Sequence, residues 1–265
     1  MKLMRVSELA DVCRSIQPVR ESTYANWQKA LKPLEHLQIA EVNKAVALQY
    51  RSKLLQPNGP LKQNTLKQRI ATLRGLWNKA IDFELISGDN HWNKTDRGLK
   101  YLRRNPELYP WQHYSHYHDD PYFVFLWYTG ARIQEIAGLY PENIVMDTEI
   151  PYFNFVHQQN RMLKNDDSIR KMPIHPACYR LIPDFRMSKA KDPGRSWSET
   201  FKKNMNLPLG DAAHTLRHSF TSRCNEAGIL ERVQDAFVGH APRSMTARYG
   251  RVTLSLLSRE LQKLQ

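Results

Sequence analysis

The sequence has little cysteine and no long apolar run. Only three cysteines occur in 265 residues, they are far apart, and none forms a CxxC pair: Cys13, Cys178 and Cys224. This pattern favours reduced thiols over a disulfide framework or a zinc knuckle. The most hydrophobic stretch, residues 123–128, is far shorter than the ~20 residues of a membrane-spanning helix, and the first residues lack the apolar core of a signal peptide. We therefore expect a cytoplasmic protein without a membrane partner.

Acidic residues are scarce relative to basic ones. The chain has 26 Asp and Glu against 39 Lys and Arg, a formal net charge of +13, and the excess extends over both halves. This excess favours a polyanionic partner such as nucleic acid, although solvated surface lysines and arginines would give the same count. Hydrophobic residues make up 41% of the chain and six tryptophans occur. That content is enough for packed cores and excludes a disordered chain.

The first hundred residues have helical patterns. One helix is expected from Ser22 or Thr23 to about Pro33, and another from Val42 to the turn at 57–60. Apolar residues recur at steps of three and four over 66–81, which predicts a third helix. Five basic residues of this region are candidates for a DNA-binding face rather than an ordinary solvated one: Lys62, Lys67, Arg69, Arg74 and Lys79.

A polar, turn-rich segment at residues 87–104 is the best candidate for a linker. Beyond it the sequence is mixed. The patterns predict a helix over 122–128, mainly helix after Pro176, and three short strands at 144–146, 152–156 and 170–174.

Residues 214–218 carry the first chemical signal. His214, Arg217 and His218 are spaced i, i+3 and i+4, so they share one face of a helix. Two histidines four apart also occur in zinc-binding HExxH helices, but Thr215 stands where the glutamate would be, and the charge of Arg217 disfavours a metal ion. A row of positively charged donors is better suited to a phosphate.

Further motifs lie on both sides of this segment. A Thr-Gly-Ala-Arg run ends at Arg132 and is followed by Glu135, while His240 follows a glycine and Tyr249 has basic neighbours. In order and spacing these motifs resemble the tyrosine recombinases of the phage integrase family, and the resemblance covers the whole chain. The turn that contains Lys164 resembles the lysine-bearing β-turn of that family.

The resemblance implies a phosphate-binding set. Arg132 and Arg217 would hold the non-bridging oxygens of the scissile phosphate, because a guanidinium is planar and always charged. His240 would add a third donor to the transition state. Glu135 would orient Arg132 or its neighbours, or form a plain ion pair, and His218 would either support the phosphate or pack within its helix.

The resemblance also implies the groups that form and break bonds. Tyr249 would attack the phosphorus and leave a 3′-phosphotyrosyl link, with His214 accepting or relaying its proton. Lys164 would protonate the departing 5′ oxygen. No metal or other cofactor is implied, because cationic side chains supply the charge stabilisation.

The fold implied is mainly α. A SAM-like helical core-binding domain would occupy residues 1–97, and a mixed α/β catalytic domain with a small three-stranded sheet would occupy residues 98–265. Since the chain begins almost at the core-binding helices, we expect either a minimal two-domain recombinase or a longer full-length protein.

The implied function is site-specific DNA recombination by an integrase of a prophage or genomic island, in the cytoplasm and associated with the nucleoid. Its partners would be double-stranded attachment-site DNA, three further copies in a homotetramer on synapsed DNA, and a directionality or architectural DNA-bending protein. A type IB topoisomerase and a recombinase-derived DNA-binding protein that no longer cleaves are the alternatives.

The last residues contain an apolar stripe, formed by Leu254, Leu257, Leu261 and Leu264 on one helix face. Packing on its own domain is the commoner outcome of such a pattern. The resembled family commonly docks this segment on a neighbouring protomer, and on that ground we expect docking between protomers here.

Overall fold

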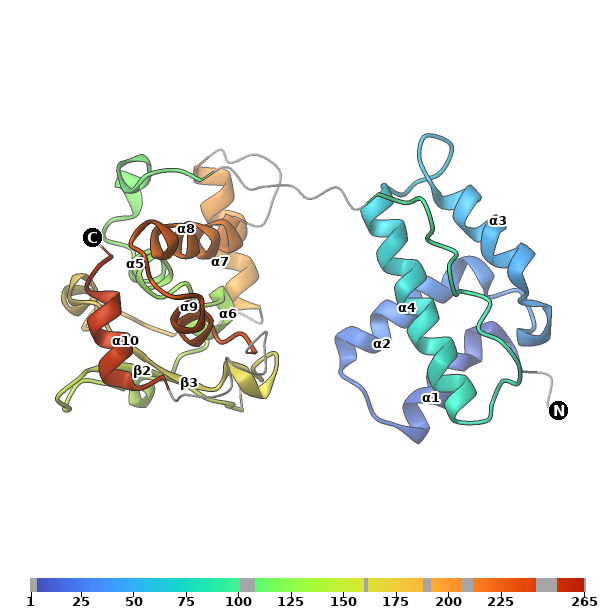
Figure 1. Ribbon diagram of the computed structural model, residues 1–265, viewed down its shortest axis with the longest axis horizontal. Helices are drawn as coiled ribbons and strands as arrows, with labels where there is room; N and C mark the ends of the chain where they lie inside the picture. Colours follow the sequence, from blue (N-terminus) through green and yellow to red (C-terminus); the bar gives the residue numbers. More distant parts are fainter. Residues whose placement is uncertain are drawn as a thin grey trace. The chain divides into compact units, whose positions relative to one another are not determined.

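The chain folds into two compact units, residues 1–104 and 105–265 (Figure 1). The computed structural model describes residues 4–100, 108–159, 162–187, 192–205, 212–241 and 252–264. Each unit has its own hydrophobic core. Among the helices in these described ranges, none combines the length and the apolar character needed to cross a bilayer.

The first unit is helical. Its main helices are α1 (Leu9–Ile16), α2 (Glu21–Leu31), α3 (Lys44–Leu54) and α4 (Gln63–Asp82). The apolar face predicted over 66–81 lies within α4, where Leu66, Ile70 and Leu73 are fully buried and contact the other helices. Asn43 caps α3 by accepting a hydrogen bond from the Val46 amide at 3.1 Å, as expected for an asparagine at this position. The three helices predicted for this part of the chain are therefore confirmed.

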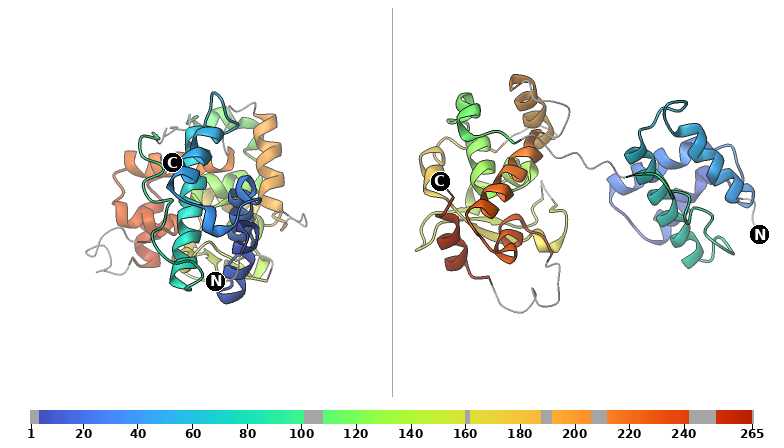
Figure 2. Two further views of the ribbon diagram at one scale, coloured as in Figure 1. Left: turned by 90° about the vertical axis from the view of Figure 1, so that its right-hand side faces the viewer. Right: turned by 45° about the horizontal axis from the view of Figure 1, so that its top comes forward.

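The segment expected to be a linker belongs instead to the core of the first unit as far as residue 100. Trp92 is completely buried and makes edge-to-face contacts with Tyr50 and Trp77, at ring-centroid distances of 5.2 and 5.6 Å. The Lys44 ammonium donates hydrogen bonds to two backbone carbonyls of the segment. The segment itself runs back along α4 (Figures 1 and 2). The linker prediction was wrong for residues 87–100, because the polar composition of this segment gave no sign that the indole of Trp92 is buried.

The second unit is built around α5 (Pro121–Thr129), a helix that is apolar on all sides and almost fully buried. A small antiparallel sheet lies beside it in the order β1 (Ile144–Val145), β2 (Tyr152–Phe155) and β3 (Arg170–Pro173). The remaining helices are α6 (Ile133–Ala137), α7 (Pro193–Asn204), α8 (Ala212–Glu226), α9 (Glu231–Val238) and α10 (Leu254–Leu261). The expected fold class, mainly α with a small three-stranded sheet, is confirmed.

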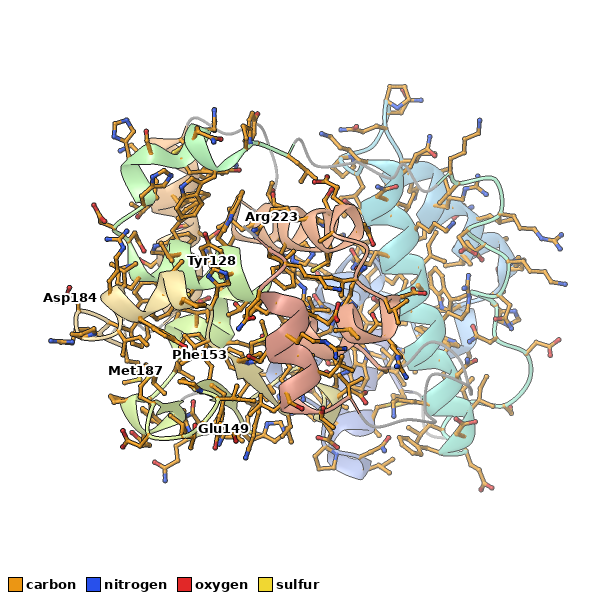
Figure 3. The ribbon with its side chains drawn as sticks, turned by 60° about the vertical axis from the view of Figure 1, so that its left-hand side comes forward. Tyr128, Glu149, Phe153, Asp184, Met187 and Arg223 are labelled. Atoms are coloured by element: carbon orange, nitrogen blue, oxygen red, sulfur yellow. The ribbon has the colours of Figure 1, made fainter. Side chains whose placement is uncertain are left out.

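Aromatic contacts join α5 to the sheet and to α8. Phe125 contacts Phe153 of β2 with ring centroids 5.0 Å apart. The Arg223 guanidinium of α8 lies 4.2 Å from the Trp127 ring. It also lies 5.7 Å from the ring of Tyr128, which Figure 3 labels together with Arg223. These contacts fix α8 against α5, and α8 carries three of the predicted site residues.

The apolar stripe near the end of the chain packs within its own unit. Leu257, Leu261 and Leu264 are at most 5% exposed and belong to the second core. Figure 1 shows α10 lying across the sheet, where it contacts β3. In the single chain the stripe therefore packs on its own domain, the commoner outcome of such a pattern, and docking on a neighbouring protomer stays a prediction.

Candidate active site

Arg217 is the most deeply buried of the predicted site residues in the described part of α8. Its Nη1 donates to the carbonyl of Gly130 and its Nη2 to the carbonyl of Val238, both at 2.7 Å. Gly130 ends α5 with a φ of +59°, and a Cβ there would collide with the Phe220 ring. Glycine is therefore required at this position both for its backbone conformation and for its lack of a side chain. The Thr-Gly-Ala-Arg turn thus presents a carbonyl that holds Arg217 in place.

Burial and nearby positive charge lower the pKa of Arg217, but its guanidinium stays protonated. Burial lowers its pKa to about 9, and the positive charge of Arg132 acts in the same direction. The guanidinium is still a cation at neutral pH. Two cationic side chains that repel one another in a partly buried site favour binding of an anion, because its charge compensates theirs.

Arg132 stands immediately before α6 and is held by the first turn of that helix. Its Nη1 donates to Glu135 Oε1 at 2.8 Å and to Ser168 Oγ at 3.1 Å, and its backbone amide donates to Glu135 Oε2 at 3.0 Å. About a quarter of the side chain is exposed. Glu135 thus orients Arg132 by forming an i,i+3 ion pair with it. The two roles predicted for Glu135, orienting Arg132 and forming a plain ion pair, are therefore the same contact.

Glu135 also binds a cation that the sequence did not single out. Arg170 of β3 donates from Nη2 to Glu135 Oε2 at 2.8 Å, from Nε to the Phe237 carbonyl at 2.7 Å, and from Nη1 to the Ser168 carbonyl at 2.8 Å. Burial alone would raise the pKa of Glu135, but the charges and hydrogen bonds of Arg170 and Arg132 lower it to about 2. Arg170 of the sheet therefore contacts α6 through the Glu135 carboxylate and the end of α9 through the Phe237 carbonyl.

His240 follows α9 and lies beside Arg217. Gly239 ends the helix with a φ of +65°, and a Cβ there would approach Arg170 Nη1 to 2.9 Å. His240 Nε2 is 2.9 Å from Arg217 Nη2, and its Nδ1 is 3.4 Å from Asp235 Oδ1. Burial first, and then the charge of Arg217, lower the pKa of His240. Arg132, Arg217 and His240, called here the donor triad, are thus brought together from three parts of the chain.

His214 and His218 are exposed on the same face of α8, with ring centroids 4.8 Å apart. Together with Arg217 and His240 they line a cavity of about 700 Å³ that extends between α8 and α9. Burial, and then the charge of Arg217, lower the pKa of His218. No group of three or more metal-ligating side chains able to hold an ion occurs among the described residues.

Lys164 is exposed in the connection between β2 and β3. The end of this connection is fixed, because Ser168 accepts a hydrogen bond from Arg132 and donates one to Asn165. The chain around Lys164 is thus tied to the donor triad through Ser168. Tyr249, the predicted nucleophile, lies outside the described residues.

The five basic residues predicted to face DNA divide into two groups. Four of them bind their own unit: Lys67 the carbonyl of Leu99, Arg69 the side chain of Tyr50, Arg74 the carboxylate of Asp96, and Lys79 the side chain of Gln17. Lys62 is exposed just before α4, and Arg69 is half-buried on that helix. Holding residues 87–100 in place is thus one structural use of this basic face.

Sequence reasoning missed Arg170, Ser168 and Asp235. Arg170 carried one usable signal, since it lies two residues before Met172 in a short strand, and residues two apart in a strand share one face of the sheet. Asp235 lies five residues before His240, and only the helix end between them brings the two side chains together.

Solved structures of similar fold belong to DNA integrases. The integrase of transposon Tn1549, in complex with a circular intermediate DNA, has a TM-score of 0.67 and 19% identity, covering 97% of this chain and 99% of that chain. A lambda integrase dimer bound to a core site and a lambda integrase tetramer bound to a Holliday junction each have a TM-score of 0.64, at 17% and 15% identity, covering 93% of this chain and 77% of theirs. No protein-family model and no curated protein matches the sequence. The chain therefore has the tyrosine recombinase fold.

Proposed function

We propose that the protein is a tyrosine-type site-specific recombinase, which cuts and rejoins double-stranded DNA through a 3′-phosphotyrosyl intermediate. The geometry of Arg217 carries this proposal. Its guanidinium is buried, fixed by two carbonyls, and in contact with His240 at 2.9 Å. A guanidinium binds phosphate oxygens through paired hydrogen bonds, and the donor triad contains two guanidinium groups, those of Arg132 and Arg217.

The proposed reaction is an exchange of phosphate esters. The Tyr249 oxygen forms a bond to phosphorus, and the bond from phosphorus to the 5′ oxygen breaks. The phenolic proton passes to His214, and the leaving oxygen takes a proton from Lys164. The donor triad stabilises the extra negative charge on the non-bridging oxygens. Attack by the 5′ hydroxyl of another strand reverses these steps, so religation needs no ATP.

The finer assignment concerns the biological setting. We assign residues 1–97 to binding of the core site and residues 98–265 to catalysis, in an integrase of a prophage or genomic island that acts as a tetramer. The solved integrase from Tn1549 contains a circular intermediate DNA, and the lambda integrase tetramer contains a Holliday junction. These complexes support the assignment by similarity of fold.

Replacing the predicted nucleophile tests the chemistry. The protein is incubated with a labelled pool of nicked duplexes of randomised sequence, and denaturing gels detect covalent protein–DNA adducts. The wild-type protein should form adducts and Tyr249→Phe should form none while still retarding the same pool in native gels. Tyr179→Phe, which changes an exposed tyrosine of the same unit, should behave as wild type. An adduct formed by Tyr249→Phe would overturn the assignment.

The alternatives give different results in two simple assays. Relaxation of supercoiled plasmids regardless of sequence would identify a type IB topoisomerase, whereas dependence on one inserted site supports a recombinase. Retardation of DNA with no adduct at any site would identify a protein that binds without cleaving. EDTA should leave adduct formation unchanged, because the donor triad supplies the charge stabilisation.

A further inference from the structure

Asp235 holds His240 through both its backbone and its side chain. The Asp235 carbonyl accepts hydrogen bonds from the amides of Gly239 and His240, the second at 2.9 Å. Its carboxylate oxygen is 3.4 Å from His240 Nδ1. The Asp235 side chain is 11% exposed, whereas that of His240 is 42% exposed. A buried carboxylate thus lies behind an imidazole that faces the cavity.

The contacts of His240 determine where its proton lies. An arginine can only donate hydrogen bonds, so His240 Nε2 accepts one from Arg217 Nη2 at 2.9 Å. The hydrogen of the neutral ring is therefore on Nδ1, where it points at Asp235. In this state Nε2 has no hydrogen to give to a phosphate oxygen.

The surroundings of His240 shift its pKa in opposite directions. Burial and the charges of Arg217 and Arg132 lower the pKa of His240, while the charge and hydrogen bond of Asp235 raise it. The described groups that act on the ring thus come from α8, from the turn before α6, and from α9. A phosphodiester bound to the two arginines would compensate their charges, and Asp235 would then favour the imidazolium.

We propose that Asp235 is a positioning residue that makes His240 a donor which responds to bound phosphate, an inference that rests on the proposed function. In the free protein the neutral ring accepts from Arg217. When a phosphate engages Arg217, Nε2 leaves the guanidinium, takes up one proton from solvent and donates it in a hydrogen bond to a phosphate oxygen. Asp235 accepts from Nδ1 throughout, so no bond of the ring changes except the N–H that is gained.

Nuclear magnetic resonance of protein labelled with ¹⁵N in histidine tests the ring directly, with His240→Gln identifying the signal. The wild type should have its neutral hydrogen on Nδ1, and inorganic phosphate should increase the proton affinity of His240. Asp235→Asn, which keeps an acceptor but removes the charge, should lower that affinity about tenfold or more, as expected when an opposite charge within 4–6 Å is lost. Asp235→Glu should restore much of it. An unchanged titration in Asp235→Asn would overturn the proposal.

The rate of adduct formation as a function of pH supplies the second test. Because the proposed donor is the imidazolium, the rate falls as pH rises through the pKa of the bound state. In Asp235→Asn this fall should begin about one pH unit lower, with rates near those of wild type in acid. A defect of folding would lower the rate equally at every pH, and that result would also refute the proposal.

A matched control separates this effect from a general change of charge. Glu226→Gln removes an exposed carboxylate of α8 whose partner is Ser222, and its pH profile should match wild type. If the wild type forms no adduct, the proposed function fails, and the titration of His240 still decides whether Asp235 sets the charge of the ring.

Discussion

Glu135→Gln should destabilise the second unit by about 3 kcal/mol at neutral pH. The pKa of Glu135 falls from its ordinary value of 4.5 to about 2, and each pH unit corresponds to about 1.4 kcal/mol of differential stabilisation. The side chain is only 3% exposed, so solvent screening takes away little of this amount. Glutamine keeps the shape but leaves Arg132 and Arg170 without their shared anion, and losing one partner of a buried ion pair typically costs about 3–5 kcal/mol.

The sign of the pH dependence follows from the lowered pKa. A carboxyl group with a lowered folded-state pKa contributes its full stabilisation above the unfolded value, and this contribution is lost as pH falls from about 4.5 towards 2. Wild type and Glu135→Gln should therefore differ most at neutral pH and converge in acid. At neutral pH the melting temperature of the second unit should fall by roughly 6–12 °C.

Urea unfolding followed by hydrogen exchange and mass spectrometry measures this difference unit by unit. Peptides from residues 108–264 should lose protection, whereas those from residues 4–100 should not. Glu199→Gln is the matched control, because Glu199 pairs with Arg195 at 2.8 Å but is 66% exposed, and it should change the free energy of unfolding by less than about 1 kcal/mol. A loss of under about 1 kcal/mol in Glu135→Gln, or a difference that does not shrink in acid, would refute the reasoning.

Three further outcomes are expected. Arg217→Ala should slow adduct formation about 100-fold or more, as when one preorganised donor is removed; a change within threefold would exclude it from the phosphate site. Trp92→Ala should destabilise the first unit by about 3–5 kcal/mol, measured by hydrogen exchange, whereas a true linker residue would have no effect. Leu261→Ala should destabilise the second unit by about 2–5 kcal/mol at all protein concentrations; a loss seen only in assembled protein would indicate docking between protomers.

Local patterns predicted most of the fold. The apolar repeat of α4 and the alternation of β2 are properties of neighbouring residues, so the sequence contains them directly. The segment at 87–100 was wrongly predicted to be a linker, because two contacts with distant residues hold it in the core. Trp92 packs against Tyr50, and Lys44 of α3 donates a hydrogen bond to a backbone carbonyl of the segment. The surface that α10 packs on within its own unit could not be predicted, because periodicity reveals an apolar face but not the surface that covers it.

The candidate site was predictable to a different extent. The family resemblance selected the donor triad, and the structure brings these three residues together. Arg170 and Asp235 could not be found in the same way, because their roles depend on contacts across the fold. An ion pair between residues 35 positions apart, such as Arg170 with Glu135, leaves no periodic signal in either segment.

The anchoring of Arg217 has an entropic consequence. A long side chain normally loses about 0.5–1.5 kcal/mol of conformational freedom when an interface immobilises it. Arg217 has already lost this freedom on folding, because the carbonyls of Gly130 and Val238 hold its guanidinium before any DNA arrives. The exposed Lys164 has not. In the proposed reaction the phosphate would thus bind an Arg217 guanidinium that is already ordered. The remaining loss of side-chain entropy would come from Lys164, which donates the proton to the leaving oxygen.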